Sequence, residues 1–452
     1  MGISRVLIAN RGEIALRIIK ACHDLGIETV AVVSEIDRES KPANEADRAV
    51  CIGPSQAVNS YLKVKTIVAA ALGSGADAIH PGYGFLAEQP DLVEACQDNN
   101  LTFIGPTADN IRKMGDKLLA REMIGKLGIP VIPGSEMVST GEEAKKAATA
   151  LGFPVLIKAA AGGGGKGIKT VNIPGDLKDV FSEASGEALA AFGDGRVFVE
   201  RYIPNARHIE VQVMGDSQGN IVHLFERDCS LQRRYQKILE EAPSPVVTEE
   251  LRKRICDAAV RVATHIGYEN AGTIEFVFDQ DQNLFYFLEM NTRIQVEHPI
   301  TEMITGIDLV KEQIIVAAGN PLSICQKDIK MSGHSIECRI NAESPGRNFH
   351  PSPGRINLWG PPKGDGIRID SHCYSGYFVP PYYDSLLAKL VTWGDDRSEA
   401  IKKMQYALDN FTISGVDTTV PFHRYILQNN DYLEGKINTR WIEDTVLREY
   451  EK

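Results

Sequence analysis

Two glutamates have the type and spacing of a cation-binding pair. Residues 273–278 and 284–290 are rich in the aromatic and branched side chains that favour β-strands, and the residues between them are typical of a turn. A hairpin centred on Gln282 would place Glu275 opposite Glu289. Directly opposed side chains lie roughly 5 Å apart at Cβ, so these two carboxylates would repel each other.

A divalent cation is the simplest way to offset that repulsion. Oxygen ligands hold such ions, and Asn291, on the same face by strand parity, adds an amide oxygen to those of Glu275 and Glu289. Hard ligands of this kind suit Mg²⁺ that bridges to phosphates better than they suit zinc. The alternatives are a shifted strand register, or one glutamate that simply meets an arginine.

Polar residues continue to alternate with apolar ones after the second strand. If the chain stays extended, five polar side chains share one side with the cation site: Glu289, Asn291, Arg293, Gln295 and Glu297. This set contains the cation, amides and carboxylates needed to hold an anion and to move its proton. Five solvated surface residues would give the same alternation.

A glycine run marks a second place for chemistry. Residues 162–165 are four consecutive glycines between Lys158 and Lys166. Glycines let the backbone approach a ligand closely and turn its N–H groups toward phosphate oxygens, so we interpret the run as a mobile lid over phosphates. It is not a Walker A loop, because no Lys-Ser/Thr pair ends it. The alternative is a flexible hairpin turn.

The first hundred residues alternate between buried strands and helices. Strands are predicted at 5–10, 29–34, 76–80 and 101–105, with a helix at 13–25. This order is typical of a parallel α/β domain. The first turn lacks the glycine fingerprint of a dinucleotide site, so we expect no nucleotide in this domain.

Later segments predict a different architecture. Strands at 154–158 and 196–200 flank the glycine run, and paired strands such as 209–213 and 221–225 follow it. We therefore expect an α/β fold that becomes α+β in its C-terminal part. The predicted units are an N-terminal domain at 1–105, linker helices at 106–130, a lid domain at 131–202 and a C-terminal unit at 203–452.

The composition excludes several classes of protein. A chain of 452 residues is too long for a single core, and its formal net charge of −11 argues against a nucleic-acid binder. None of the eight cysteines stands in Cys-x-x-Cys spacing, so a zinc site or a disulfide framework is not expected. The N-terminal apolar run at 6–9 is too short for a signal peptide or a membrane span. We expect a cytoplasmic protein in a reducing compartment.

Residues 289–298, Glu-Met-Asn-Thr-Arg-Ile-Gln-Val-Glu-His, resemble the signature of biotin carboxylases within the ATP-grasp superfamily. Five further segments resemble the same family, in order along the chain: 8–17, 80–86, 114–117, 226–234 and 337–343. The resemblance implies an ATP-grasp fold with an N-terminal parallel α/β domain, a glycine-rich lid domain and a C-terminal mixed-sheet domain. It also implies that ATP and bicarbonate are used to carboxylate biotin.

The resemblance assigns residues to the nucleotide. Those expected on or over the ATP phosphates are Lys117, Lys158, Gly164 and Gly165. Those expected beside the adenine and the rest of the nucleotide are Glu200, Arg201, Tyr202, Ile203, His208 and Tyr235. Mg²⁺, or Mn²⁺ in its place, is expected on Glu275, Glu289 and Asn291. Tyr235 stands where a histidine is common in the family, and a tyrosine can still stack or donate a hydrogen bond there.

The resemblance also assigns residues to bicarbonate and biotin. Those expected to hold bicarbonate are Lys237, Arg293 and the backbone of Val296, and Glu297 is expected to deprotonate it. Those expected at biotin are Tyr83, Gln295 and Arg339. The expected catalytic residues are thus Lys237, Arg293, Glu297 and Arg339, with Arg339 stabilising the biotin enolate.

The biotin is expected on another protein. No Ala-Met-Lys-Met attachment motif follows the carboxylase segments, so we expect a separate biotin carboxyl carrier protein and carboxyltransferase subunits. The family is commonly dimeric, with the Arg17 region at the interface. We expect the first half-reaction of acetyl-CoA carboxylase. The biotin carboxylase component of a two-subunit pyruvate carboxylase, or of another acyl-CoA carboxylase, is the alternative.

Two other functions stay open at this point. A different ATP-grasp ligase, which joins a carboxylate to an amine through an acyl phosphate, would share the metal site and the lid. The segment 293–297 and Arg339 favour biotin over that ligase. A silent nucleotide-binding or scaffold subunit would be expected to have lost a charged site residue, and the sequence retains the main ones.

Overall fold

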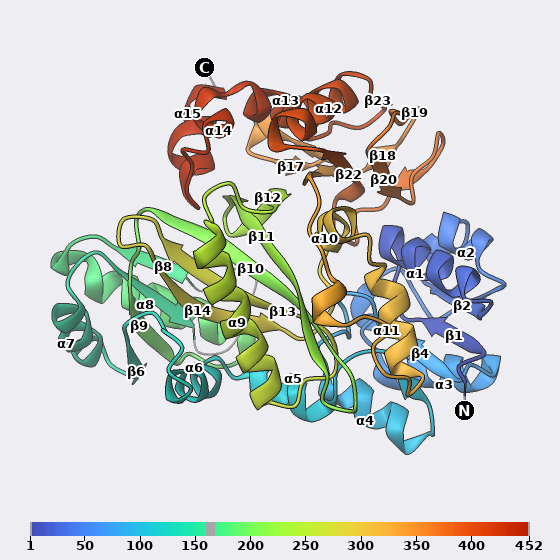
Figure 1. Ribbon diagram of the computed structural model, residues 1–452, viewed down its shortest axis with the longest axis horizontal. Coiled ribbons are helices and arrows are strands. Elements are labelled where there is room, and N and C mark those ends of the chain that lie inside the picture. Colours follow the sequence, from blue (N-terminus) through green and yellow to red (C-terminus); the bar gives the residue numbers. More distant parts are fainter. Residues whose placement is uncertain (1, 160–167, 451–452) are drawn as a thin grey trace.

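The structure of the protein, a computed structural model, describes residues 2–159 and 168–450. The glycine run, with Gly164 and Gly165, lies outside the described residues, so its expected role over the phosphates stays a prediction. The N-terminal residues lie at one end of the molecule, residues 141–151 and 177–192 lie at the other, and a long sheet runs between them (Figure 1).

The N-terminal residues form the expected parallel α/β domain. Its sheet has the order β3-β2-β1-β4-β5, formed by β1 (Arg5–Ile8), β2 (Glu28–Val33), β3 (Arg48–Cys51), β4 (Ala78–His80) and β5 (Thr102–Phe103). The helices are α1 (Gly12–Asp24), α2 (Lys41–Glu45), α3 (Val64–Ser74) and α4 (Pro90–Asp98). Val6, Leu7 and Ile8 are all fully buried, as expected for a parallel strand that is covered on both faces.

The first strand is shorter than predicted. β1 ends at Ile8, because Asn10 turns out of the sheet and its side chain donates to the carbonyls of Pro81 and Tyr83, both at 2.7 Å. These two bonds tie the start of α1 to the segment 80–86. Two segments that are far apart in the sequence therefore lie side by side.

Helices α5 (Ala108–Gly115) and α6 (Lys117–Lys126) follow the N-terminal sheet and fall within residues 106–130. The Asp116 carboxylate accepts from the backbone N–H groups of Leu118 at 3.1 Å and Leu119 at 3.0 Å, which caps α6. Lys117 is therefore held on the first turn of a capped helix.

A small antiparallel sheet follows. Its order is β6 (Gly134–Val138), β9 (Val197–Arg201), β7 (Val155–Ala159) and β8 (Ile168–Val171), with α7 (Gly141–Leu151) and α8 (Leu177–Phe192) beside it. Ile157 and Val199 belong to the core that this sheet shares with its helices. Side chains alternate along a strand, so Lys158 and Glu200 point to the other face.

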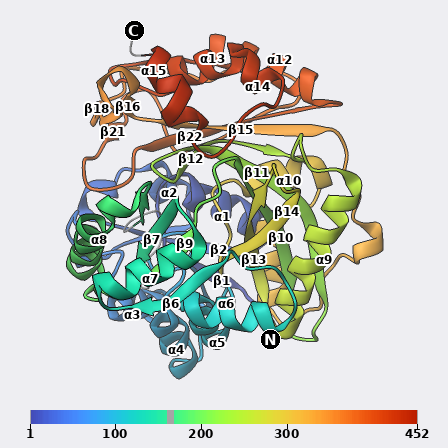
Figure 2. The same ribbon diagram turned by 90° about the vertical axis from the view of Figure 1, so that its left-hand side faces the viewer.

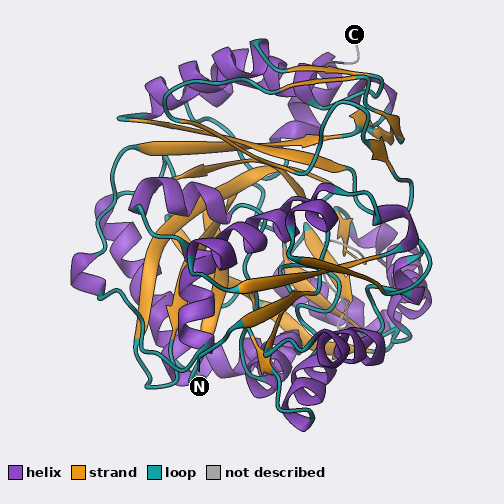
Figure 3. Ribbon diagram, turned by 90° about the vertical axis from the view of Figure 1, so that its right-hand side faces the viewer, coloured by secondary structure: helices purple, strands orange, loops and turns teal. Residues whose placement is uncertain are grey.

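An eight-stranded antiparallel sheet runs through the middle of the molecule (Figure 2, Figure 3). Its strands in order are β14 (Leu284–Asn291), β13 (Asn270–Asp279), β10 (Ala206–Gly215), β11 (Ile221–Arg233), β12 (Gln236–Ala242), β15 (His334–Asn341), β22 (Leu386–Gly394) and β20 (Ile367–Ser371). β12 pairs with β15, so the same sheet continues from the strands of residues 206–291 into the C-terminal strands β15, β22 and β20.

The remaining elements surround this sheet. The helices are α9 (Glu249–His265), α10 (His298–Thr305), α11 (Leu309–Ala317), α12 (Arg397–Asp409), α13 (Val420–Gln428), α14 (Asn430–Leu433) and α15 (Leu447–Tyr450). The short strands are β16 (Glu343–Ser344), β17 (His350–Pro351), β18 (Gly354–Arg355), β19 (Leu358–Gly360), β21 (Phe378–Val379) and β23 (Thr412–Ser414). Among the described residues, no helix is long and apolar enough to cross a membrane.

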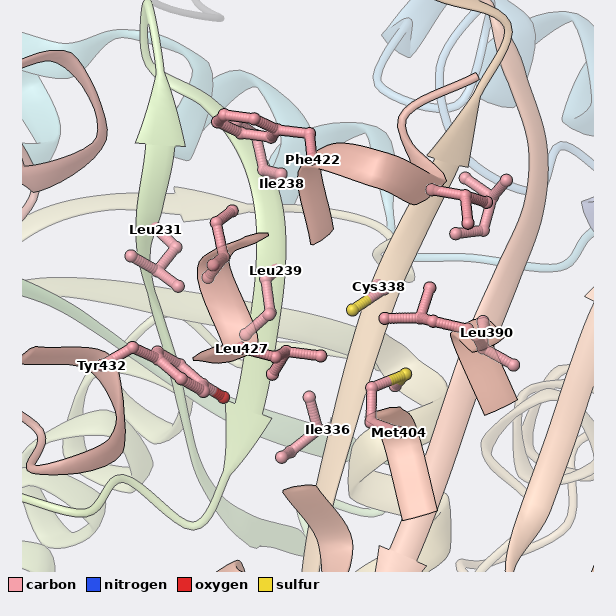
Figure 4. Close-up of a cluster of buried hydrophobic side chains, with 14 of the residues drawn as sticks. Leu231, Ile238, Leu239, Ile336, Cys338, Leu390, Met404, Phe422, Leu427 and Tyr432 are labelled. Carbon is pink, nitrogen blue, oxygen red and sulfur yellow. The ribbon is translucent and has the colours of Figure 1, made fainter. Parts of the chain in front are cut away.

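The C-terminal helices cover one face of the long sheet. Figure 4 shows the apolar side chains between the two layers, which include Leu231, Leu239, Ile336, Cys338, Leu390, Met404, Leu427 and Tyr432. These side chains come from β11, β12, β15 and β22 on one side and from α12, α13 and α14 on the other. Their burial stabilises the end of the sheet that carries Arg339.

Glu241 of β12 adds an ionic link to the same layer. Its carboxylate accepts from Nε of Arg397 on α12 at 2.7 Å and lies 2.9 Å from Nε2 of His334 on β15. Burial acts to raise the pKa of Glu241, but His334 and Arg397 outweigh it and lower the pKa to about 2.

We expect Glu241→Gln to lower the free energy of unfolding by on the order of 3 kcal/mol at pH 7. A carboxyl with a lowered folded pKa contributes stability that is lost as the pH falls through that value. The deficit should therefore shrink as the pH falls from 4.5 toward 2, which urea unfolding at several pH values would measure. The exposed Glu434→Gln is the control, and a deficit that stays constant with pH would contradict the assignment.

Candidate active site

The β13–β14 hairpin sets the two predicted glutamates opposite each other. The strands pair Phe278 with Phe285 near the turn, and Glu275 with Glu289 farther along. The register shifts between these positions, which makes Leu288 the extra residue of a β-bulge. Without the bulge, Glu275 would face Leu288, so the bulge creates the carboxylate pair.

The extended chain predicted beyond residue 291 is wrong. β14 ends at Asn291, and α10 begins at His298, directly after Glu297. Glu88, which sequence reasoning missed, holds the turn between them by accepting from the backbone N–H of Thr292 and from Nε of Arg293, both at 3.0 Å. The predicted grouping is nevertheless correct, because the five alternating polar side chains all line one cavity.

This cavity has a volume of about 630 Å³ and lies between the small sheet, the long sheet and the loop before β22. It contains most of the predicted site: Tyr83, Lys117, Lys158, Glu200, His208, Tyr235, Lys237, Glu275, Glu289, Asn291, Arg293, Gln295, Val296, Glu297 and Arg339. The described lining does not include Arg201, Tyr202 or Ile203. Arg201 donates to the Tyr286 hydroxyl at 2.7 Å and Ile203 packs into a small core, so their contact with adenine stays a prediction.

Lys237 lies at the centre of the charges in this cavity. Its ammonium nitrogen is 2.5 Å from Glu210, 2.6 Å from Glu297 and 3.1 Å from Glu275. Burial acts to lower the pKa of Lys237, but the three carboxylates outweigh it and hold the pKa well above its ordinary value. Lys237 is therefore charged at neutral pH and offsets three acidic groups at once.

Glu210 was not predicted from the sequence. It is fully buried on β10, pairs across the strands with Glu275 and binds Nε of Arg227 at 2.5 Å. Glu210, Glu275 and Glu289 therefore form a row across β10, β13 and β14. Only the pairing of β10 with β13 brings Glu210 into this row, so no local pattern in the sequence marks it.

Arg227 supports the row from β11. It is fully buried and donates to Gln212 at 2.8 Å, to Thr301 at 3.0 Å and to Gln295 at 2.7 Å, besides its ion pair with Glu210. Gln295 in turn donates to Glu275 at 2.9 Å. Arg227 thus fixes both Gln295 and the carboxylate row, and it was missed although it lies within the segment 226–234.

Glu297 lies between two cations. Its Oε1 is 2.6 Å from Nζ of Lys237, and its Oε2 accepts from Nη2 of Arg339 at 2.9 Å. Burial raises the pKa of this carboxyl and Glu210 repels its charge, but Lys237 and Arg339 together lower the pKa below its ordinary value. Glu297 is therefore ionised at neutral pH, which is the state a general base requires.

The predicted metal ligands already have cationic neighbours. Glu275 lies 3.1 Å from Lys237 and 3.2 Å from Nε2 of His208, while Glu289 lies 2.8 Å from Lys117. The repulsion between the two glutamates therefore does not by itself demand a metal. Their oxygens and that of Asn291 still form a hard donor set at one end of the cavity, and this set fits Mg²⁺.

His208 extends the same cluster. Its Nε2, Glu210 and Glu275 bring ligand atoms within 4.8 Å of one another. Burial acts to lower the pKa of His208, but Glu275 and Glu210 raise it to about 9. A histidine in this state is a cation, so it serves the carboxylate row as a charge partner.

Lys158 and Arg121 share one carboxylate. Lys158 of β7 and Nη1 of Arg121, at 2.7 Å, both bind Glu200 of β9. Arg121 lines the cavity and was not predicted. It stands four residues after Lys117 on α6, and residues at that spacing share a helix face, so the sequence contained this signal.

A chain of polar contacts holds the Val296 backbone. Tyr83 donates to Glu13, Glu13 lies 3.0 Å from Nζ of Lys389, and Lys389 donates to the carbonyl of Val296 at 3.1 Å. The contacts join the N-terminal domain, the long sheet and the turn before Glu297. Glu13 and Lys389 were not predicted.

Glu240 of β12 and Glu337 of β15 form a second opposed pair behind Arg339. Both are fully buried, and Glu240 accepts from Nε of Arg339 at 2.6 Å. Within the described residues, neither oxygen of Glu337 has a hydrogen-bond partner. Burial raises the pKa of Glu240 to about 7, and burial together with Glu240 raises that of Glu337 well above its ordinary value. Glu337 therefore keeps its proton to a higher pH than an exposed glutamate does.

Three family models match consecutive parts of the chain. "Biotin carboxylase, N-terminal domain" matches residues 2–111, "Carbamoyl-phosphate synthase L chain, ATP binding domain" matches 116–325, and "Biotin carboxylase C-terminal domain" matches 337–444. Every predicted site residue falls within one of these three ranges.

Named relatives match over nearly the full length. The chain is 53% identical to Biotin carboxylase 1 of Bacillus subtilis, covering 98% of each chain. It is 51% identical to one of the subunits of the pyruvate carboxylase of Methanothermobacter thermautotrophicus, over 98% of this chain and 90% of that one. The biotin carboxylase domain dimer of Hydrogenobacter thermophilus 2-oxoglutarate carboxylase, solved with MgADP, ADP and bicarbonate, has a TM-score of 0.95 and 48% identity over 98% of each chain.

The buried Glu337 makes a prediction for stability. A carboxyl whose folded pKa is raised contributes stability that is lost as the pH rises through that value. Glu337→Gln removes this loss, so the variant should gain stability relative to the wild type as the pH is raised from 4.5 toward neutral, by up to about 1.4 kcal/mol per pH unit. Urea unfolding across that range is the measurement, with the exposed Glu250→Gln as control. A difference that does not change with pH would show that Glu337 titrates like an exposed glutamate.

Proposed function

Because the chain belongs to the biotin carboxylase family, we propose that its cavity carboxylates biotin in two linked steps, with ATP and bicarbonate as the other substrates. The full-length matches confirm the predicted ATP-grasp fold and an ATP-dependent ligase of this family. The roles of the individual residues are our proposal.

One observation carries these roles. The ionised Glu297 contacts Lys237, which is paired with the carboxylate row, and Arg339, which belongs to the predicted biotin end. A base at this position can take a proton from bicarbonate, and the adjacent Arg339 can bind biotin. The two steps can therefore share one cavity without moving the intermediate far.

The first step phosphorylates bicarbonate. Bicarbonate binds beside Lys237 and Arg293, and Glu297 removes its proton. An oxygen of the resulting dianion attacks the γ-phosphorus of ATP, the bond to ADP breaks, and carboxyphosphate and ADP form. Lys117 and Lys158 neutralise phosphate charge, which is the main contribution a protein makes to phosphoryl transfer.

Glu275, Glu289 and Asn291 would hold the metal. Mg²⁺ held there would supply positive charge to neutralise the phosphates. The Hydrogenobacter domain was solved with MgADP and bicarbonate, which supports the same ligands for this chain. Mn²⁺ shares the preference for oxygen ligands and is the alternative ion.

The second step carboxylates biotin. Carboxyphosphate splits into CO₂ and phosphate, the phosphate takes the N1 proton of biotin, and N1 attacks the carbon of CO₂. Arg339 stabilises the negative charge that develops on the ureido oxygen. Tyr83 and Gln295 line the part of the cavity that would receive the biotin ring.

We assign the biotin to a separate carrier protein and the later transfer to carboxyltransferase subunits. The Methanothermobacter relative, which is named as one component of a pyruvate carboxylase and of which the chain covers 90%, supports a function within a multi-subunit enzyme. Acetyl-CoA carboxylase is our first choice for that enzyme, and a pyruvate or another acyl-CoA carboxylase is the alternative. All eight cysteines are free, which suits a cytoplasmic location.

We also propose a homodimer, as in the Hydrogenobacter domain dimer. Arg17, expected near the interface, is itself buried and pairs with Glu302 at 2.8 Å and Asp308 at 2.5 Å within one protomer. Exposed neighbours such as Lys20, and not Arg17 itself, would therefore contact a second copy of the chain.

No observation favours the two remaining alternatives. A carboxylate–amine ligase would not need Arg339 beside the base, and a silent subunit would not need the charged lining that the cavity retains. The test is ADP release from MgATP and bicarbonate, with and without free biotin. Strong stimulation by biotin is expected, and its absence in folded, ATP-binding protein would overturn the proposal.

Glu297→Gln should abolish turnover and preserve nucleotide binding. The amide cannot accept the bicarbonate proton, so bicarbonate-dependent ADP release should fall by about 100-fold or more. Calorimetric titration with MgATP should give an affinity close to that of the wild type. Wild-type turnover in this variant would remove Glu297 from the role of base.

Arg339→Ala should separate the two steps. Biotin carboxylation should fall by about 100-fold, because the enolate loses its cation. ADP release in the absence of biotin should fall much less, since Arg339 acts on the first step only through its contact with Glu297. Equal losses in the two assays would contradict the assignment to the enolate.

A further inference from the structure

The cavity opens to solvent beside Asp384. This residue lines the cavity and is also exposed, and it lies with Ser385 on the loop before β22. Asp384 lines this cavity together with Tyr83 and Arg339, and a smaller cavity of about 120 Å³ is also lined by Tyr83 and Asp384. The mouth at Asp384 therefore belongs to the proposed biotin end.

The loop at this mouth is anchored by Tyr383. Its hydroxyl donates to the carbonyl of Ser55 at 2.5 Å and lies 2.6 Å from Oγ of Ser34. The Arg11 guanidinium lies 4.1 Å from the centre of its ring, and the ring meets Tyr61 edge-on at 5.7 Å. The N-terminal domain thus fixes this loop from several sides.

The neighbouring Tyr382 is presented outward. Its side chain is 46% exposed, its only described ring contact is the edge of Tyr383 at 6.4 Å, and the exposed Pro381 precedes it. Exposed aromatic side chains on a rigid backbone are typical of protein–protein contacts, because little conformational freedom is lost on binding.

We infer that residues 381–384 form a docking surface for the domain that carries biotin, with Tyr382 as its main contact. This inference rests on the proposed function. A biotin attached to a lysine enters the cavity only if its parent domain is held close to the mouth, and Asp384 places the mouth two residues from Tyr382. The surface adds affinity for the carrier without touching the biotin ring.

The test compares two substrates in one enzyme. The probes are free biotin and the biotinylated carrier protein purified from the source organism through its biotin. Tyr382→Ala should lower kcat/KM for the carrier by about tenfold and change kcat/KM for free biotin by no more than about twofold. Tyr382→Phe, which keeps the ring, should retain most of the activity on the carrier.

The control is Tyr406→Ala on α12, which removes an aromatic side chain that is 54% exposed and does not line the cavity. It should leave both substrates unaffected. Parallel losses on carrier and free biotin in Tyr382→Ala, or no loss on either, would overturn the docking surface. If the proposed function is wrong, the wild type itself will carboxylate neither free biotin nor the carrier. That result would be distinct from a loss in Tyr382→Ala alone, and it would also overturn the docking surface.

Discussion

The ammonium group of Lys237 joins three buried carboxylates that come from different parts of the chain. Glu210, Glu275 and Glu297 come from β10, from β13 and from the turn before α10, and each lies within 3.1 Å of Nζ of Lys237. Removing one partner from a buried ion pair typically costs about 3–5 kcal/mol, because an uncompensated charge remains. The position of β12 is therefore as important to the chemistry as the identity of the base.

The proposed reaction depends on which charged groups in the site are paired with each other. Lys237 joins the carboxylate row to Glu297, and Glu297 joins Lys237 to Arg339. The same cations that neutralise the site keep the base ionised against the effect of burial. Behind Arg339, burial raises the pKa of both Glu240 and Glu337, whereas the pKa of Glu297 in front of it is lowered. The carboxyl groups on the two sides of this arginine therefore shift in opposite directions.

Much of this could be predicted from the sequence where the pattern is local. A hairpin centred on Gln282 placed Glu275 opposite Glu289, and strand parity grouped the polar residues from Asn291 to Glu297. The alternation of apolar strands and helices predicted the parallel N-terminal sheet. The bulge at Leu288 and the end of β14 at Asn291 were not visible, because each depends on tertiary contacts such as that of Glu88. Glu210, Arg227 and Glu240 were missed for the same reason, since their partners are brought close only by strand pairing and by the packing of the long sheet.

The central claim is that one cavity both activates bicarbonate and transfers its carbon to biotin. The most direct measurement follows radiolabelled bicarbonate and ADP together, with wild-type protein, MgATP and saturating free biotin. Equal molar amounts of labelled carboxybiotin and ADP are predicted, because the intermediate forms and reacts beside the same Glu297–Arg339 pair. ADP formation with no label on biotin would contradict the account.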